Sequence, residues 1–476
     1  MRIVYAASEA APFIKTGGLG DVAQALPNAL SKIKGNEVIL FLPYYSKIKN
    51  DSSIKTEFVK SFYVNLAWRK QHVGVFKFQS ARKKLKVYFI DNEYYFNRDT
   101  VYGQHDDGER FAYFSMAILE TLKQLDIKPD VFHCNDWQTA LLPILLRGFY
   151  QDSLGEAKTV FTIHNIEYQG WCDQYFLNDT LGLDESYRNT LSFNGSLNFM
   201  KGAILTVDSL TTVSRTYANE IKYPYYSHGL SEIIDEHSFK LSGVVNGIDL
   251  ESNNPMTDGN IFENYGLENF ESGKAKNKAE LQKMLGLEIN SNKPLVGMVT
   301  RIVSHKGFEL ICDIAKDLMK RDIQLVILGT GDASYEQFLK SISDRNKEKF
   351  SLNLCFDSKL ASKIYAASDI YLMPSKSEPC GLSQLIAMRY GTIPVVNATG
   401  GLKDTVEAFD GQEKGTGFTF QSFSREDLLN AIDRCVYAYG SDKWSTIVKN
   451  AMKYDSSWDK PAKEYMKIYN DCIARQ

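Results

Sequence analysis

Residues 1–33 read MRIVYAASEAAPFIKTGGLGDVAQALPNALSKI and hold an apolar run, a glycine-rich turn and a helical pattern in direct succession. The apolar run Ile3–Ala7 has the length of a short buried strand. After the turn, apolar residues recur at helical spacing from Val22 to Ile33. Strand, glycine turn and helix in this order predict the first unit of an α/β domain.

The rest of the first half continues the alternation of strands and helices. Strands are predicted at 38–42, at two or more places in 58–90, and at 131–133, 159–163, 210–213 and 243–245, with helices at 111–125 and 137–149. Alternation of this kind favours a parallel sheet with helices on both faces.

The second half repeats the pattern after a break. Residues 246–277 turn to Asn, Gly, Glu and Pro, which predicts a connector between domains. Strands are then predicted at 295–299, 324–328, 352–356, 370–373 and 393–396, and helices at 308–320, 335–343, 359–367 and 383–390. The predicted fold class is α/β, with two Rossmann-like doubly wound domains.

Composition excludes several classes of protein. The 476 residues are 44% hydrophobic and 24% charged, with a net charge of −3, so neither disorder nor a global attraction to nucleic acid is expected. The seven cysteines form no C-x-x-C pair, as suits a reducing compartment. With neither a signal-peptide pattern nor a membrane-spanning apolar run, we expect a cytoplasmic protein that binds no membrane and no nucleic acid. Oligomeric state leaves no signal in the sequence.

The glycine-rich turn is a candidate anion site. Gly17 and Gly18 let backbone N–H groups approach an anion at a helix N-terminus, Lys15 adds a positive charge, and Asp21 is expected to cap the helix. Its spacing matches neither G-x-G-x-x-G nor the P-loop, which argues against an NAD-dependent oxidoreductase. The alternative is a purely structural strand-to-helix turn.

Two cations follow the first predicted strand of the second half. Arg301 and Lys306 lie where parallel sheets bind ligands, and such a pair suits a diphosphate, with a solvated loop as the alternative. Glu378 lies between a predicted strand and a helix, where it can cap the helix, bind a ligand or act as an acid or base. For a lone loop glutamate the default is a surface position.

The sequence gives no sign of a metal site. His164 follows a predicted strand and can bind a polar ligand or satisfy a local carbonyl. Neither H-E-x-x-H nor any Asp-x-Asp pair occurs, so a diphosphate site is expected to use Lys, Arg and helix N-termini rather than a divalent ion.

Taken together, these motifs resemble bacterial glycogen synthases and plant starch synthases over essentially the whole chain. They are Lys15–Val22, Thr162–Gly170, Val245–Asp249, Thr300–Gly307, Glu378–Leu382 and Thr399–Leu402. The resemblance implies a glycosyltransferase-B architecture with an active site between two domains, 1–245 on the acceptor side and 246–455 on the donor side. It also implies that 456–476 holds a helix, at about 460–473, that returns to the first domain.

The resemblance implies transfer of glucose from ADP-glucose to the non-reducing 4-OH of an α-1,4-glucan, with retention and with no metal or other cofactor. It implies five catalytic residues: Lys15 on the donor phosphates, Arg301 and Lys306 on the leaving diphosphate, Glu378 on the glucose hydroxyls and His164 on the glucose 6-OH. Implied substrate contacts are Gly17, Gly18, Asp21, Asp136, Asn246, Phe356 (stacking on adenine), Cys380, Gly381, Leu382 and Ser383.

Departures from the family pattern leave alternatives open. His305 stands where Gln is usual, Ser377 where Phe is common, Asn254 where Trp is common and Ser383 where Thr is frequent. The alternatives are a retaining transferase that uses UDP-glucose or another acceptor, and a non-catalytic glucan-binding protein. The second is expected to lack Lys15 or Glu378, and both are present.

Overall fold

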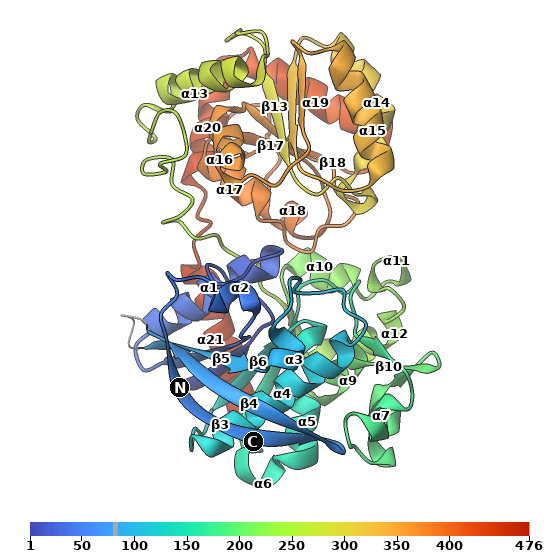
Figure 1. Cartoon of the computed structure of the whole chain (residues 1–476). Coiled ribbons are helices and arrows are strands. Elements are labelled where there is room, and N and C mark those ends of the chain that lie inside the picture. Colours follow the sequence, from blue (N-terminus) through green and yellow to red (C-terminus); the bar gives the residue numbers. More distant parts are fainter. Residues whose placement is uncertain (80–83, 476) are drawn as a thin grey trace. The chain divides into compact units, whose positions relative to one another are not determined.

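The computed structural model describes residues 1–79 and 84–475. The chain forms two compact units: unit 1 is Met1–Asn246 together with Trp458–Gln476, and unit 2 is Gly247–Ser457. In Figure 1, unit 1 takes the blue-to-green part of the chain plus the red helix α21, and unit 2 takes the yellow-to-red part.

Unit 1 contains a nine-stranded sheet in the order β12-β11-β7-β6-β1-β2-β5-β4-β3. The strands from β12 to β5 pair in parallel, while β4 pairs antiparallel with both β5 and β3. Their bounds are β1 Arg2–Ala6, β2 Glu37–Pro43, β3 Thr56–Leu66, β4 Arg69–Phe78, β5 Leu85–Asp91, β6 Val131–Asn135, β7 Lys158–Ile163, β11 Ser209–Thr212 and β12 Leu241–Gly243. A small second sheet holds β8 Trp171–Cys172, β9 Ser192–Phe193 and β10 Ser196–Asn198.

Of the helices of unit 1, α1, α4, α10 and α21 pack against strands of this sheet (Figure 1). The bounds of the unit 1 helices are α1 Gly18–Lys32, α2 Ser46–Lys49, α3 Glu93–Phe96, α4 Asp107–Gln124, α5 Leu142–Phe149, α6 Gln151–Leu154, α7 Phe176–Asp179, α8 Arg188–Leu191, α9 Phe199–Thr206, α10 Arg215–Glu220, α11 Pro224–Ser227, α12 Ser231–Glu236 and α21 Asp459–Ala474. The C-terminal helix α21 packs against α1 and β7, and its Tyr465 and Tyr469 are fully buried.

Unit 2 has a six-stranded sheet in the order β15-β14-β13-β16-β17-β18, all parallel. Its strands are β13 Leu295–Val299, β14 Gln324–Leu328, β15 Phe350–Asn353, β16 Ile370–Met373, β17 Ile393–Asn397 and β18 Phe418–Phe420. Its helices are α13 Phe270–Leu285, α14 Phe308–Lys320, α15 Ala333–Arg345, α16 Ser358–Ala367, α17 Ser383–Arg389, α18 Gly400–Thr405, α19 Arg425–Tyr439 and α20 Trp444–Lys453.

The predicted connector 246–277 is wrong over its last residues, because helix α13 begins at Phe270. This helix buries Lys274, Asn277 and Lys278, which satisfy their polar groups by hydrogen bonds instead of forming an apolar face. Apolar residues therefore do not recur at helical spacing in this segment, and the sequence pattern did not indicate a helix.

Other boundaries also differ from the prediction. The strand expected at 352–356 is β15, Phe350–Asn353, and the one expected at 243–245 is β12, Leu241–Gly243. The helix expected at 137–149 is split into a 3₁₀ turn, Trp137–Thr139, and α5. Strand β18 and the helices α18, α19 and α20 extend unit 2 beyond the elements that the sequence pattern predicted.

Over residues 1–79 and 84–475, no helix is both long and apolar enough to cross a membrane.

Candidate functional site

Three of the predicted site segments of unit 1 follow neighbouring strands. Strand β1 lies between β6 and β2, so the chain crosses to opposite sides of β1, and this is the switch point where open α/β sheets bind ligands. The glycine turn follows β1, Asp136 follows β6 and His164 follows β7. Parallel pairing brings the carboxyl ends of these strands to one edge of the sheet.

The glycine turn presents its charge to solvent. Gly17 is the N-cap of α1, and Lys15, Gly17 and Gly18 are all exposed. Asp21 does not cap the helix as predicted: it lies in the first turn, and its carboxylate pairs with Lys15 Nζ at 2.7 Å. Both side chains of this pair are well exposed, so the pair contributes little to stability and leaves Lys15 able to exchange partners.

Glu9, which the sequence analysis missed, accepts hydrogen bonds from the glycine turn. Glu9 is only 2% exposed and accepts hydrogen bonds from Thr16 N at 2.6 Å, Thr16 Oγ1 at 2.5 Å and Gly20 N at 3.1 Å. Burial raises the pKa of Glu9, while these hydrogen bonds act in the opposite direction. An acidic residue between a first strand and a glycine turn was the signal available in the sequence.

Asp136 and His164 are brought together at the ends of β6 and β7. Asp136 Oδ1 accepts the backbone N–H of His164 at 2.7 Å and that of Asn165 at 3.3 Å. Burial raises the pKa of Asp136 to about 7 and lowers that of His164 to about 3. Asp136 also has φ 54° and ψ 179°, a conformation that costs a non-glycine residue energy and that is found most often at functional sites.

In unit 2 the structure joins Lys306 to Glu378. Strands β13 and β16 are parallel neighbours, so the loops that follow them lie side by side. Lys306 Nζ lies 2.6 Å from Glu378 Oε2, and Ser375 Oγ donates to the same oxygen at 3.0 Å. Glu378 is therefore not the surface residue expected by default: its side chain is 8% exposed and that of Lys306 17%.

Glycines allow these loops to approach closely. Gly307 has φ 83°, and a Cβ there would lie 2.0 Å from the carbonyl oxygen of Pro374. A Cβ on Gly401 would lie 2.2 Å from the carbonyl oxygen of Cys380, and Gly401 N donates to the carbonyl of Glu378 at 3.0 Å. The loops after β13, β16 and β17 thus form one packed cluster around Glu378.

Gln384 holds this cluster from inside, and the sequence analysis missed it. It is fully buried, and its Nε2 donates to the carbonyls of Cys380 at 3.1 Å and Gly381 at 2.9 Å and to Thr405 Oγ1 at 3.0 Å. Cys380 is buried, Gly381 has φ 73°, Leu382 is the N-cap of α17, and Ser383 is its first residue. A polar second residue in a helix that follows a Glu-Pro-Cys-Gly turn is no distinctive sequence pattern.

Among the described residues, no hydrogen bond or ion pair joins the side chain of Arg301, Phe356 or Asn246 to these groups. Arg301 is exposed, and within the described chain its side chain makes no hydrogen bond or ion pair. Phe356 is 93% exposed and lies in the loop after β15. Asn246 is buried, and its Oδ1 has no partner among the described residues.

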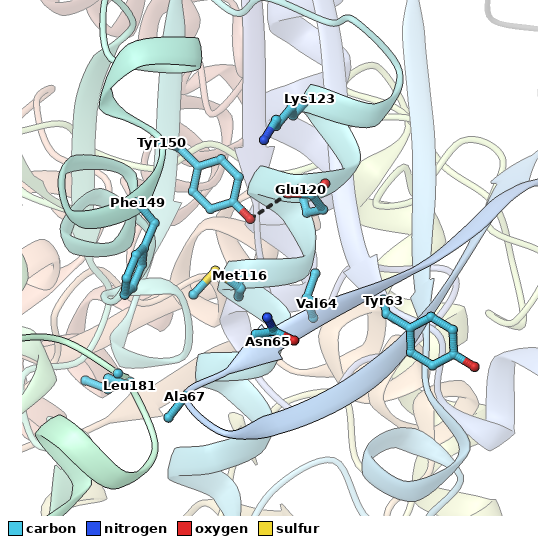
Figure 2. A pocket seen from close by; sticks show the side chains of 11 residues that line it. Tyr63, Val64, Asn65, Ala67, Met116, Glu120, Lys123, Phe149, Tyr150 and Leu181 are labelled. Atoms are coloured by element: carbon cyan, nitrogen blue, oxygen red, sulfur yellow. Dashed lines mark hydrogen bonds between the residues drawn. The ribbon is translucent and has the colours of Figure 1, made fainter.

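A separate pocket of about 420 Å³ lies on unit 1 and contains none of the predicted residues (Figure 2). Tyr63, Met116 and Phe149 line it, and Tyr150 donates to Glu120 across it at 2.8 Å. In residues 1–79 and 84–475, no group of three or more His, Cys, Asp or Glu side chains is placed to hold a metal ion.

Comparison with known proteins gives matches over both units. Residues 2–236 match the family model described as starch synthase catalytic domain, and residues 282–451 match that of glycosyl transferases group 1. The chain is 47% identical to a glycogen synthase of Clostridium botulinum, covering 100% of each chain, and 47% identical to one of Clostridium acetobutylicum, covering 98% of this chain and 99% of the relative.

Solved structures give the same result. The catalytic domain of starch synthase IV from Arabidopsis thaliana, bound to ADP and acarbose, matches with a TM-score of 0.91 and 36% identity over 99% of both chains. Sucrose-phosphate synthase from Thermosynechococcus elongatus matches with a TM-score of 0.61 and 16% identity over 100% of both chains, which is a likeness of fold.

Proposed function

The chain belongs to the family of glycogen synthases and starch synthases, with the glycosyltransferase-B fold, and from that premise we propose that it transfers glucose from ADP-glucose to the non-reducing 4-OH of an α-1,4-glucan. The observation that carries the proposal is the pair of Lys306 and buried Glu378 at the switch point of the unit 2 sheet. A lysine and a carboxylate held together offer a cation for a phosphate and an acceptor for sugar hydroxyls.

The donor half of the proposal rests on unit 2. Lys306 and the exposed Arg301 stabilise the negative charge that develops on the departing diphosphate, and Glu378 accepts hydrogen bonds from the glucose hydroxyls. Exposed Phe356 provides a face for stacking an adenine ring, and the ADP bound by the Arabidopsis starch synthase supports an adenine nucleotide. Lys15, Gly17 and Gly18 of unit 1 bind donor phosphate.

The proposed step breaks the bond between glucose C1 and the diphosphate oxygen and forms a bond from C1 to the acceptor 4-O. The acceptor proton passes to the departing diphosphate oxygen on the same face, which retains the α configuration. His164 stays neutral because burial lowers its pKa to about 3, so it contributes hydrogen bonding rather than charge. Removal of one contact that stabilises developing charge typically costs about 3 kcal/mol of transition-state stabilisation.

The test is to incubate the purified full-length chain with glycogen and either ADP-glucose or UDP-glucose and to measure nucleotide release and glucan growth. We expect release from ADP-glucose, unchanged by EDTA, and a loss of about 100-fold in kcat/KM for Arg301→Ala and for Lys306→Ala. Preference for UDP-glucose would replace the donor in the proposal. If nucleotide is released from neither donor, the transferase hypothesis is rejected, and the alternative of a non-catalytic glucan-binding protein is left.

A cytoplasmic location and the absence of a cofactor remain predictions from the sequence.

A further inference from the structure

Asn135, the last residue of β6, is fully buried, and its side chain contacts that of His164. Its Nδ2 donates to the carbonyl oxygen of Ala6 at 2.9 Å and lies 3.5 Å from that of His133. A backbone carbonyl only accepts hydrogen bonds, so the amide nitrogen of Asn135 must face these oxygens. The orientation of the Asn135 amide is therefore fixed by the backbone of two strands.

The opposite end of that amide faces His164. Asn135 Oδ1 lies 2.9 Å from His164 Nε2 and 2.9 Å from the hydroxyl of Tyr5. An amide oxygen cannot donate, so both neighbours donate to it, and His164 must carry a hydrogen on Nε2. With that hydrogen in place, a neutral imidazole keeps a lone pair on Nδ1, and Nδ1 makes no hydrogen bond within the described chain.

The backbone of His164 is held separately. Its N–H donates to Asp136 Oδ1, and Asp136 directly precedes the 3₁₀ turn Trp137–Thr139. The side-chain tautomer and the backbone position of His164 are thus set by two consecutive residues with different roles.

We propose that Asn135 is a positioning residue that holds His164 as the Nε2–H tautomer, so that Nδ1 serves only as a hydrogen-bond acceptor and selects a sugar hydroxyl that donates to it. The proposal rests on the function proposed above for its ligand, a glucosyl donor. It reverses the simplest expectation for a neutral histidine beside a sugar, in which the ring donates. The other tautomer would place two lone pairs against each other at 2.9 Å in a buried position, a bias of about tenfold or more.

The tautomer can be measured without an activity assay. The full-length chain has seven histidines, and labelling them with ¹⁵N allows a long-range ¹⁵N–¹H correlation spectrum in which protonated and bare ring nitrogens separate. The His164 signals are identified by their loss in His164→Gln. We expect a protonated Nε2 and a bare Nδ1, and a protonated Nδ1 would overturn the proposal.

Two matched variants separate positioning from general support of the fold. Tyr5→Phe removes one hydrogen bond to Asn135 Oδ1 but leaves the acceptor of His164, so the Nε2–H tautomer should persist. Asn135→Leu removes the acceptor, so a protonated Nδ1 should appear and KM for the donor should rise about tenfold or more. A pure Nε2–H tautomer with unchanged KM in Asn135→Leu would overturn the proposal.

If Asn135→Leu fails to fold, the wild-type spectrum and Tyr5→Phe still decide the question. The two proposals fail separately: an Nε2–H tautomer in a chain that transfers no glucose rejects the transferase alone, and an Nδ1–H tautomer in an active enzyme rejects the role of Asn135 alone.

Discussion

Replacement of Lys306 by Met should destabilise the loop cluster of unit 2 because it leaves the buried carboxylate of Glu378 without a cation. At 2.6 Å and an effective dielectric constant of about 20, the attraction is about 6 kcal/mol before desolvation is subtracted. Loss of one partner from a buried pair costs about 3–5 kcal/mol, and Ser375 Oγ remains as one donor to Glu378. We therefore expect a loss of about 3 kcal/mol.

The effect of a second substitution, Glu378→Gln, on stability should have opposite signs in the wild type and in Lys306→Met. In the Lys306→Met background, Glu378→Gln removes the uncompensated charge and should restore about 2 kcal/mol. In the wild type the same substitution breaks the pair and should destabilise. The two residues should thus show a coupling energy of about 2 kcal/mol or more, which a double-mutant cycle isolates.

Hydrogen exchange measured by mass spectrometry is the suitable assay, because a chain of two units need not unfold in one step. In peptides covering 300–310 and 370–382, a loss of 3 kcal/mol corresponds to about 150-fold faster exchange. Lys376→Met is the control, because Lys376 lies on the same loop as Glu378 and its side chain is 41% exposed; it should change the local stability by less than about 0.5 kcal/mol. Equal destabilisation of both backgrounds by Glu378→Gln, or a loss of stability in Lys376→Met as large as in Lys306→Met, would show that Lys306 does not compensate the charge of Glu378.

Three further predictions concern other contacts. Glu9→Ala leaves three hydrogen-bond donors of the glycine turn without their acceptor. Hydrogen exchange in residues 16–20 should therefore show a loss of local stability of about 3 kcal/mol, and KM for the glucosyl donor should rise. Thr16→Val removes only one of those donors and should cost about 1 kcal/mol, so equal losses in the two variants would contradict this prediction. Burial lowers the pKa of His164 from 6.5 to about 3, so below pH 6.5 the unfolded chain gains a proton that the folded chain refuses, and stability is lost as pH falls. Between pH 7 and pH 5, the free energy of unfolding of His164→Gln, measured by denaturant titration, should therefore fall by about 2 kcal/mol less than that of the wild type. An identical pH dependence in the two proteins would show that His164 is not buried in its neutral form. Phe356→Ala should raise KM for ADP-glucose about tenfold with no change in thermal stability, since the ring is 93% exposed and stacking on a base is worth about 1–3 kcal/mol; an unchanged KM would remove Phe356 from the donor site.

Much of the fold could be predicted because its strands are short apolar runs in the sequence. The predicted elements 308–320, 324–328 and 370–373 coincide with α14, β14 and β16. The prediction failed where polar residues are buried by pairing rather than exposed, as in α13, whose Lys278 Nζ lies 2.7 Å from Asp369 Oδ2. Pattern reasoning takes a polar residue as a solvent-facing one, and only a partner 91 residues away makes Lys278 an interior residue.

The site divides in the same manner. The sequence by itself determined which segments we predict to carry chemistry: glycines and cations placed directly after apolar runs, in positions where parallel strands end. It also determined the class of fold, because the period of apolar residues depends only on local order along the chain.

Only the tertiary structure decided how those residues are paired and buried. It paired Lys306 with Glu378 across 72 residues, placed Glu9 beneath the glycine turn, and set Asn135 against His164. The physical reason is that burial and hydrogen bonding depend on neighbours in space. Groups brought together by the order of strands in the sheet, rather than by their order in the chain, keep His164 neutral and compensate the charge of Glu378. The same groups set the direction of each hydrogen bond.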